Sequence, residues 1–578
     1  MAYVITQPCC NDASCIPECP VDCIRPTPDQ PEFATTEMLY IDPATCIDCG
    51  SCVDACPVDA IYSEDDLPET MRRYTRINAD YFLRHPLQPD ITSPLPSTRS
   101  LPKGHETLRV AIVGAGPSAC YAAHELLKRG NVEINVLERL PTPWGLVRAG
   151  VAPDHPKTKR ITELFESIFA TEAVQCYLNV TVGTHVSLAE LLNHHHAVIY
   201  AVGASASRRL GIPGEELPGS HSAIEFVAWY NGHPDYADHA FDLSGKRAVI
   251  VGNGNVALDV ARILTTDPAE LSTTDIADYA LEALRHSNIR EIVILGRRTP
   301  VQASYTCSEF LALGYLPDVE IVLDESEIIL DPASQAVIDD PAVEPSQLLK
   351  LRLAQEYARG EITTPRGHKR IVLRYLVSPV AYHGQSHIEA IEIARNEMLI
   401  DHGEPIARPT RRIGILDTSL VLRSIGHRGE PITDLPFDER RGVVPNEHGR
   451  VLGADHRPMV GVYVTGWIKR GARGVLGANR ADAEETIEQL VADFVSGALT
   501  TPSKRRAALT DLLAKRQPDM INRAGWQAID AAERAEGAAT GRPRVKLTSI
   551  NALVHAARRR GGTPHATVSA PPSGGTTE

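Results

Sequence analysis

Nine of the twelve cysteines in this 578-residue chain lie within the first 56 residues. Four of them, Cys46, Cys49, Cys52 and Cys56, have the spacing C-x2-C-x2-C-x3-C and are followed by Pro57. Three thiolates at such short intervals bind one face of an iron–sulfur cluster, and the fourth thiolate turns toward a second cluster. Zinc sites use two separated cysteine pairs, so this spacing favours iron. Disulfides are disfavoured because cytosolic reductants break them, and the chain begins without a recognisable secretory signal.

An earlier segment repeats this pattern with one change. Cys9, Cys15 and Cys19 keep the spacing, but Asp12 stands where the second cysteine belongs. Both copies continue alike, with Cys-Pro-Val-Asp-Cys-Ile from residue 19 and Cys-Pro-Val-Asp-Ala-Ile from residue 56. This internal symmetry predicts two clusters, each of which takes its fourth ligand from the other half of the repeat.

The repeat therefore predicts two ligand sets. A 4Fe-4S cluster is expected on Cys19, Cys46, Cys49 and Cys52. The other cluster is expected on Cys9, Cys15 and Cys56, either as a 3Fe-4S cluster or as a 4Fe-4S cluster with Asp12 as an oxygen ligand. Cys10 and Cys23 are expected to pack near the clusters without binding iron, although Cys10 could replace Cys9.

Residues 1–70 are thus expected to form a two-cluster domain. Its small size suggests that the clusters hold its fold together. A linker is predicted over 71–106 because the stretch from residue 83 to 104 contains five prolines and has no clear periodicity.

A nucleotide-binding loop follows the linker. The apolar run after Arg109 leads into Gly114 and Gly116, where a tight turn brings the backbone close to a pyrophosphate at the start of a helix. The next predicted strand, 132–137, ends at Glu138. A carboxylate at that position accepts a hydrogen bond from a ribose 2′-hydroxyl and repels a 2′-phosphate.

A second loop of the same kind contains Gly252 and Gly254. Its later strand, 292–295, ends in Gly296 followed by Arg297 and Arg298 rather than in an acid. Guanidinium groups at this place suit the extra phosphate of NADP. Two sites of opposite charge preference predict two different nucleotides, and FAD with NADP(H) fits this asymmetry.

Three longer stretches resemble the adrenodoxin-reductase-like ferredoxin–NADP reductases. They are Leu140-Pro-Thr-Pro-Trp-Gly-Leu-Val-Arg-Ala-Gly-Val-Ala-Pro-Asp-His155, the loop from Gly252 to Asp259, and Gly466-Trp-Ile-Lys-Arg-Gly471. With the cysteine-rich N-terminus, the whole chain resembles actinobacterial reductases that carry their own ferredoxin. The resemblance implies an α/β fold with two Rossmann-like domains, for FAD and NADP, of the glutathione/adrenodoxin reductase type, after a small α+β ferredoxin-like domain.

The resemblance also implies roles for individual residues. His155, Asp259 and Trp467 would lie near the flavin, although His155 and Asp259 could instead be structural. The FAD contacts would be Gly114, Gly116, Ser118, Glu138, Gly145, Leu146, Val182, Trp467, Gly474, Val475 and Leu476. The NADP contacts would be Asn253, Gly254, Asn255, Val256, Arg297, Arg298, Glu309 and Gly474.

The remaining boundaries follow from this layout. We expect an FAD-binding domain in two parts, 107–208 and 426–500, around an NADP-binding domain at 209–425. A C-terminal extension is expected over 501–578, helical at 505–515 and 527–536, anchored by Trp526, and disordered after about 561, where the sequence is rich in Gly, Pro, Ser and Thr.

Charge and hydropathy limit the partners. A net charge of −15 argues against nucleic-acid binding, and no apolar run is long enough for membrane insertion. A cytoplasmic enzyme is expected that passes electrons between NADPH and its iron–sulfur centres through FAD. A flavin accepts an electron pair and releases single electrons. An external acceptor, such as another ferredoxin or a haem monooxygenase, would complete the chain of transfer.

Two other functions fit parts of this sequence. A small subunit of the glutamate-synthase type also combines iron–sulfur clusters with two nucleotide loops, but the Trp-Gly-Leu-Val-Arg stretch fits that family less well. A redox sensor without catalysis would not need the intact NADP loop.

Overall fold

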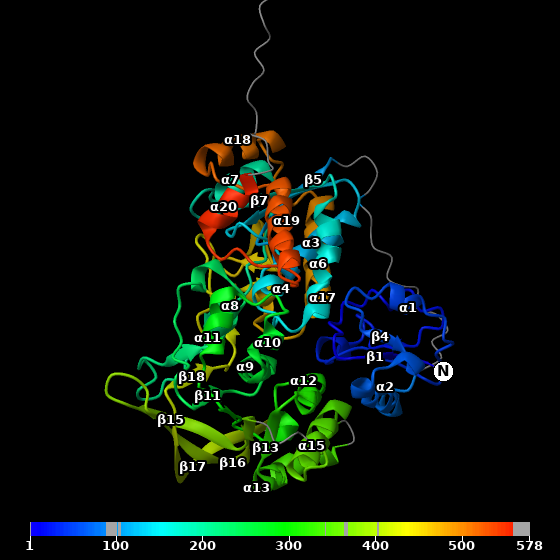
Figure 1. The fold of residues 1–578 in the computed structure, drawn as a ribbon. Helices are drawn as coiled ribbons and strands as arrows, with labels where there is room; N and C mark the ends of the chain where they lie inside the picture. The colour runs from blue at the N-terminus through cyan, green and yellow to red at the C-terminus, as the bar shows by residue number, and fades with distance from the viewer. Residues whose placement is uncertain are drawn as a thin grey trace, which may run out of the picture.

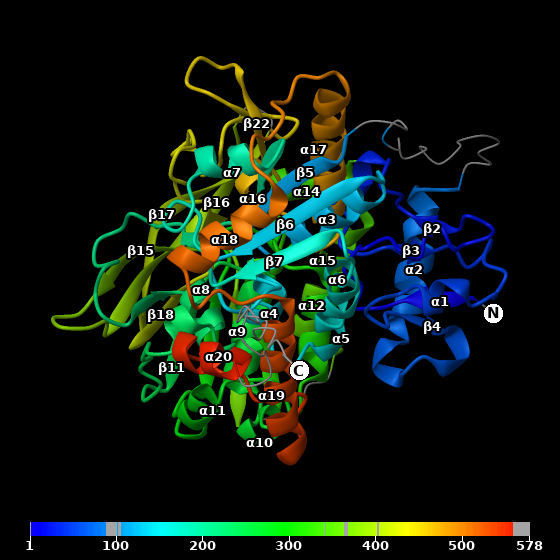
Figure 2. The ribbon, with the colours of Figure 1, turned by 90° about the horizontal axis from the view of Figure 1, so that it is seen from above.

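The computed structural model describes residues 2–87, 101, 106–340, 343–362, 368–401 and 404–558. Figure 1 shows a small N-terminal domain in blue beside two larger α/β domains. In the view from above, the small domain again lies against the flank of the larger ones (Figure 2). Among the described residues, no helix combines the length and the apolar character needed to cross a membrane.

The N-terminal domain is built from two antiparallel strand pairs. β1 (Tyr3–Ile5) pairs with β4 (Ile61–Ser63), and β2 (Ile24–Arg25) pairs with β3 (Tyr40–Ile41). Each pair joins one half of the cysteine repeat to the other half. A one-turn helix, α1 (Ser51–Asp54), carries Cys52, and 3-10 turns span Pro31–Ala34, Glu64–Asp66 and Glu69–Met71.

The predicted start of the linker at residue 71 is wrong. Helix α2 (Arg73–Arg84) occupies this region and packs on the N-terminal domain. Its buried Asn78 accepts hydrogen bonds from the amides of Ile5 and Ile41, at 3.2 and 2.9 Å. The segment contains no proline, and the proline-rich composition begins only at Pro86. Residues 88–100 and 102–105 of the predicted linker lie outside the described part of the chain.

The first large domain has a seven-stranded sheet in the order β20-β21-β22-β8-β5-β6-β7. The strands from β22 to β7 are parallel to one another, and helices α3 and α17 pack together on this domain. The elements are β5 (Leu108–Val113), β6 (Val132–Glu138), β7 (Val174–Leu178), β8 (Ala197–Tyr200), β20 (Asn446–Glu447), β21 (Arg450–Leu452), β22 (Pro458–Val464), α3 (Pro117–Leu127), α4 (Leu146–Ala149), α5 (Pro156–Lys159), α6 (Ile161–Phe169), α7 (Leu188–His194), α16 (Trp467–Arg470) and α17 (Ala478–Val495).

The second large domain has a six-stranded parallel sheet in the order β10-β18-β11-β12-β14-β13. Two largely apolar helices, α8 and α9, pack against each other beside it. The elements are β10 (Ser220–Ser222), β11 (Arg247–Val251), β12 (Glu291–Leu295), β13 (Val319–Leu323), β14 (Lys369–Arg374), β18 (Leu420–Arg423), α8 (Ala223–Tyr230), α9 (Asn255–Thr265), α10 (Pro268–Leu271), α11 (Asp278–Arg285), α12 (Cys307–Ala312), α13 (Glu325–Ile328), α14 (Pro332–Asp339) and α15 (Pro345–Ala358), with 3-10 turns at Pro234–Tyr236, Pro300–Gln302 and Leu313–Tyr315.

Two smaller sheets complete the reductase part. β15 (Val377–His383), β16 (Ala390–Asp401) and β17 (Glu404–Asp417) form an antiparallel sheet that projects from the second domain (Figure 1). β9 (Ala206–Ser207) pairs with β19 (His427–Arg428) at the two chain crossings between the domains. The predicted α/β fold class, with two Rossmann-like domains after a small α+β domain, is confirmed.

The C-terminal extension is an integral part of the fold. It forms α18 (Arg506–Arg516), α19 (Arg523–Ala539) and α20 (Ile550–Arg558). Trp526 packs edge-on against Trp144 of the first domain, with ring centroids 6.2 Å apart. Arg542 donates to the carbonyls of Thr274 and Ile276 in the second domain. The extension therefore ties the two large domains together. Residues 559–578, including the predicted disordered tail, lie outside the described residues.

Candidate redox site

The cysteines of the N-terminal domain line two separate cavities. One cavity is lined by Cys19, Cys46, Cys49 and Cys52, with Cys23 also in its wall. Cys49 is exposed, so we call this the outer site. The Sγ atoms of Cys19 and Cys23 are 3.4 Å apart, so Cys23 lies beside the outer site. That it packs there without binding iron stays a prediction.

The second cavity is lined by Cys9, Cys15 and Cys56, together with Cys10 and Asp12. It faces the first large domain, and we call it the inner site. Each cavity receives one cysteine from the opposite half of the repeat, as the internal symmetry predicts. The grouping agrees with both expected ligand sets, whereas the assignment of individual thiols as iron ligands stays a prediction.

The donor chemistry of both cavities suits iron–sulfur clusters. Clustered thiolates are the ligands that select such clusters. Burial raises the pKa of the Cys9 thiol to about 11 and that of the Cys52 thiol to about 12. Without a bound cation these thiols would stay protonated at neutral pH, so cluster binding has to supply the charge that holds them as thiolates. The pKa of the exposed Cys49 is lowered by hydrogen bonding to the backbone and side chain of Ser51.

The first glycine loop has the geometry of a dinucleotide site. β5 and β6 are parallel with Val113 opposite Leu137, so the loop at Gly114 and the acid Glu138 emerge at the same sheet edge. Gly114 has φ +105°, and a Cβ there would lie 2.6 Å from the carbonyl oxygen of Ala201. The Glu138 carboxylate accepts from the amide of Ala115 at 2.9 Å, which fixes it beside the loop. Burial raises the pKa of Glu138.

The other predicted flavin contacts surround this loop. Ser118 of α3 donates to Asn479 Oδ1 of α17 at 2.9 Å. Trp467 begins α16, and its indole Nε1 is buried without a hydrogen-bond partner among the described atoms, as is Nδ1 of the neighbouring His427. Burial lowers the pKa of His427 to about 4, so the ring is neutral at pH 7. These unpartnered buried groups fit a pocket that is completed by a polar cofactor.

The remaining FAD residues lie on nearby segments. Gly145 precedes α4 and lies against Gly116, and Leu146 is the first residue of α4. Val182 follows β7, on a segment tied to β6 by the hydrogen bond from the Val180 amide to the Glu138 carbonyl. The loop between α16 and α17 carries Gly474, Val475 and Leu476.

The second loop lies at the equivalent edge of the other sheet. Val251 of β11 is opposite Leu295 of β12, so the glycine loop and the two arginines emerge together. Arg297 is exposed and Arg298 is half-buried. Asn255, at the start of α9, accepts from the amide of Thr306 at 2.7 Å. The predicted NADP residues Asn253, Gly254, Asn255 and Val256 are all half-buried at the amino end of α9, as an anion site requires.

His155, Asp259 and Glu309 converge in a half-buried charge network. One ligand atom of each lies within 4.8 Å of the others, an arrangement that could hold a metal ion. However, the guanidinium of Arg262 lies among them, at 2.7 Å from Asp259 and 3.2 Å from Glu309. Arg262 also binds Asp154 at 2.5 Å. The guanidinium therefore supplies the positive charge that a metal would provide.

Arg262 is a residue that the sequence analysis missed. It follows Asp259 by three residues on one helix face, a spacing that predicts such a pair. Burial raises the pKa of Asp259 despite the opposing charge of Arg262. Burial also acts to raise the pKa of Asp154, but Arg262 outweighs it and the pKa is lowered. The network thus contains carboxylates with opposite pKa shifts, a feature of functional sites.

The N-terminal domain contacts both nucleotide domains through residues that no sequence pattern identifies. Gly477 donates its amide to the carbonyl of Cys10 at 2.7 Å. Glu37 forms an ion pair with Lys350 at 2.7 Å and accepts from the amide of Cys307. Gln7 donates to Glu309 at 3.2 Å, so the N-terminal domain also touches the charge network described above.

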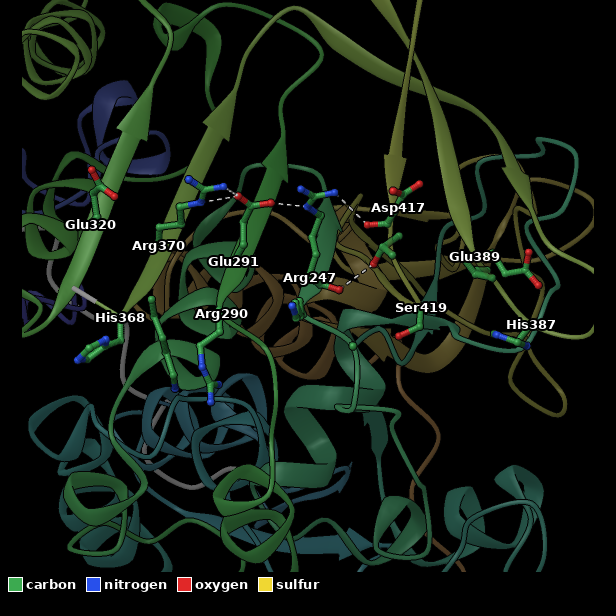
Figure 3. Close-up of a pocket in the computed structure, with 15 residues that line it drawn as sticks. Arg247, Arg290, Glu291, Glu320, His368, Arg370, His387, Glu389, Asp417 and Ser419 are labelled. Atoms are coloured by element: carbon green, nitrogen blue, oxygen red, sulfur yellow. Dashed lines mark hydrogen bonds and ion pairs between the residues drawn. The ribbon is translucent and has the colours of Figure 1, made fainter. Parts of the chain in front are cut away.

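A cavity of about 770 Å³ lies elsewhere on the second domain. Figure 3 shows that Arg247, Glu291 and Arg370 line it where their strands begin. Nucleotides bind at the carboxyl ends of parallel strands, which is the opposite edge of this sheet. Arg247 and Arg370 both pair with Glu291, so their charges are already satisfied. This cavity is therefore distinct from the predicted nucleotide sites.

Comparisons with known proteins identify two kinds of domain in this chain. Residues 108–294 match the pyridine nucleotide-disulphide oxidoreductase family, and residues 39–62 match the 4Fe-4S binding domain. Fold and site together define a pyridine-nucleotide-dependent flavoprotein oxidoreductase joined to a ferredoxin domain.

Full-length relatives identify the family. The probable ferredoxin/ferredoxin–NADP reductase of Mycobacterium tuberculosis is 47% identical over 567 residues, which cover 96% of this chain and 95% of the relative. The Mycobacterium leprae counterpart is 45% identical, with 95% and 97% covered. The structure of Mycobacterium tuberculosis FprA in complex with NADPH aligns with a TM-score of 0.73 and 44% identity, over 78% of this chain and all of FprA. The chain belongs to the ferredoxin/ferredoxin–NADP reductase family, whose members transfer electrons between NADPH and iron–sulfur centres through FAD.

Proposed function

We propose that the inner site receives electrons from the flavin and that the outer site delivers them to an external acceptor. The observation that carries this order is the contact between Gly477 and Cys10. Gly477 directly follows the loop predicted to lie on the flavin, and Cys10 lies between two residues of the inner-site wall, Cys9 and Asn11. Leu476 belongs to the same apolar cluster as Cys9 and Cys56.

The outer site has the opposite environment. Cys49 is exposed, and the neighbouring Ile47 is 59% exposed. The hydroxyl oxygen of Tyr3 lies 3.1 Å from where a Cβ of Gly50 would stand, and so closes one side of the loop. This surface gives a protein acceptor, such as another ferredoxin or a haem monooxygenase, close access to the outer site. The flanking Asp48 and Asp54 favour an acceptor with a basic face.

The cofactors follow from the same geometry. Four thiols at the outer site suit a 4Fe-4S cluster, and three at the inner site suit a 3Fe-4S cluster, or a 4Fe-4S cluster if Asp12 binds iron. FAD would be held by the Gly114–Gly116 loop, Glu138 and Trp467. NADPH would be held by the start of α9 with Arg297 and Arg298. When bound, the flavin converts a hydride pair into single electrons.

The charge network beside this site would orient its own polar side chains and hold protons on them. Arg262 fixes Asp154, Asp259 and Glu309 in one arrangement, and His155 Nε2 lies 3.9 Å from Glu309. We propose that His155 and Asp259 are polar groups near the nicotinamide and flavin, as the resemblance implies, with Arg262 as their support.

Removal of the outer cluster tests the order. In a Cys46→Ala/Cys49→Ala variant, which leaves only two of the four outer thiols, NADPH should still reduce the flavin and the inner cluster, whereas reduction of cytochrome c should be lost. Electron paramagnetic resonance after NADPH addition reports the inner cluster separately. A matched Cys176→Ala variant, which removes a buried thiol of the first large domain, should behave like the wild type. An inner cluster that stays oxidised in Cys46→Ala/Cys49→Ala would reverse the order.

A further inference from the structure

Asp12 marks the one predicted ligand position at which the two cysteine sites differ. It occupies the repeat position that Cys49 holds at the outer site, and it lines the inner cavity. The residue is 4% exposed, so its carboxylate needs partners inside the protein. Each of the two carboxylate oxygens has a hydrogen-bond partner. Oδ2 accepts from the Tyr121 hydroxyl at 2.8 Å, and Oδ1 accepts from the Ser14 hydroxyl.

The two donors differ in origin. Ser14 lies on the same loop as Asp12 and moves with it. Tyr121 belongs to α3, the helix that begins at the first nucleotide loop, and is completely buried. Its ring packs edge-on against Phe165 of α6, with centroids 5.5 Å apart. The phenol is therefore a rigid donor fixed in the reductase.

The backbone around Asp12 is held by the same domain. Arg480 of α17 donates to the Asp12 carbonyl at 2.6 Å, and Gly477 donates to the Cys10 carbonyl at 2.7 Å. Asn11 and Ala13, on either side of Asp12, both adopt left-handed conformations, with φ of 58° and 64°. Three contacts from the reductase and a tight turn thus set the direction in which the Asp12 carboxylate points.

We propose that Tyr121 is a positioning residue that holds the Asp12 carboxylate in the domain interface and keeps it from binding iron. The inner cluster then has three thiolate ligands and no fourth. This inference rests on the proposed function, because it assumes that Cys9, Cys15 and Cys56 bind iron. It makes the three-iron form of the inner cluster a consequence of how the two domains pack.

The test compares Tyr121→Phe with the wild type, using the full holoenzyme. The substitution removes only the hydroxyl, so the packing against Phe165 is kept. Both proteins are incubated with ferrous iron and dithionite without oxygen, and then reoxidised. Low-temperature electron paramagnetic resonance measures the three-iron signal, and iron analysis measures the metal content. The wild type should keep its three-iron signal. Tyr121→Phe should lose most of it and gain one iron per chain, because the released carboxylate completes the site.

Two further variants separate this effect from general damage. Tyr177 also lies in the first large domain, and Tyr177→Phe removes a hydroxyl that bonds to Thr510 at 2.8 Å. This variant should keep the three-iron signal. The double variant Asp12→Ala/Tyr121→Phe should keep it as well, because no carboxylate is left to bind. Flavin absorbance verifies that each protein is folded.

The possible outcomes separate a failure of this inference from a failure of the proposed function on which it rests. If Tyr121→Phe keeps the three-iron signal as the wild type does, Tyr121 does not control the ligand and the inference fails alone. If the wild type itself holds two four-iron clusters, both the inference and the three-thiolate assignment of the inner site fail.

Discussion

The amide of Gly477 donates a 2.7 Å hydrogen bond to the carbonyl of Cys10, and this bond joins the reductase to its own ferredoxin domain. The two residues are far apart in sequence but belong to the two segments between which we propose that electrons pass. A backbone contact of this kind fixes the separation of the two redox sites without depending on any side chain.

This contact leaves no room for a side chain at Gly477. A Cβ there would lie 1.7 Å from the carbonyl oxygen of Asn11. We expect Gly477→Ala to displace the ferredoxin domain and to slow reduction of the clusters by NADPH at least tenfold, while dye reduction by the flavin stays near normal. Stopped-flow absorbance measures both steps. Gly414→Ala, where a Cβ meets only ordinary contacts at 3.5 Å, is the control. An unchanged cluster rate in Gly477→Ala would remove the role given to this contact.

The arginines after β12 should set the preference for NADPH. Replacing Arg297 and Arg298 with Gln removes two charge-assisted contacts to the 2′-phosphate, each worth about 1.5–3 kcal/mol. The KM for NADPH should therefore rise at least about tenfold, while that for NADH changes little. Arg290 lies at the other end of the same strand, so Arg290→Gln is the matched control. Equal losses with both nucleotides would show that these arginines do not bind the phosphate.

The C-terminal extension should stabilise the fold through a buried ion pair. Arg148 of α4 bonds Glu533 of α19 at 2.5 Å, with the Glu533 side chain fully buried. Glu533→Ala leaves Arg148 and Arg544 without this partner and should cost about 3–5 kcal/mol. The urea midpoint of unfolding measures the loss. Glu216→Ala, which removes the partner of an exposed Arg209, should cost less than about 1 kcal/mol. Similar losses in both variants would argue against a structural role for the extension.

Stability should fall steeply in acid. Burial acts to raise the pKa of Asp275, but Lys159 and Lys546 outweigh it and hold that pKa far below its ordinary value. The pKa of Glu533 is likewise lowered, because Arg148 and Arg544 outweigh its burial. Groups with lowered folded pKa values stabilise the protein above their unfolded pKa, about 4, and lose this stabilisation as the pH falls further. Unfolding should therefore begin below about pH 4, as circular dichroism can show.

A substitution checks the source of this acid sensitivity. Asp275→Asn cannot be protonated, so the variant should be less stable at pH 7 and should lose less on acidification than the wild type does. An acid transition of the same steepness in both proteins would assign it to other carboxylates.

Much of the site was predictable because its signals are local. A cluster binds three cysteines within seven residues, and a dinucleotide loop needs its glycines within one turn. Both patterns are therefore visible in the sequence around Cys46 and Gly114. Parallel strand pairing then brings Glu138 to the first glycine loop and Arg297 to the second. The helix at Arg73–Arg84 was missed because the proline-rich stretch that follows it was extended too far toward the N-terminus.

Spacing along the chain is enough to predict which atoms can bind iron and nucleotides, because those ligands lie close together in the sequence. The packing of the domains sets which cysteine cavity faces the first large domain, and it brings Asp12 to Tyr121, 109 residues away. Such contacts depend on how whole domains pack, and domain packing is governed by the summed fit of two surfaces. No short motif records that fit.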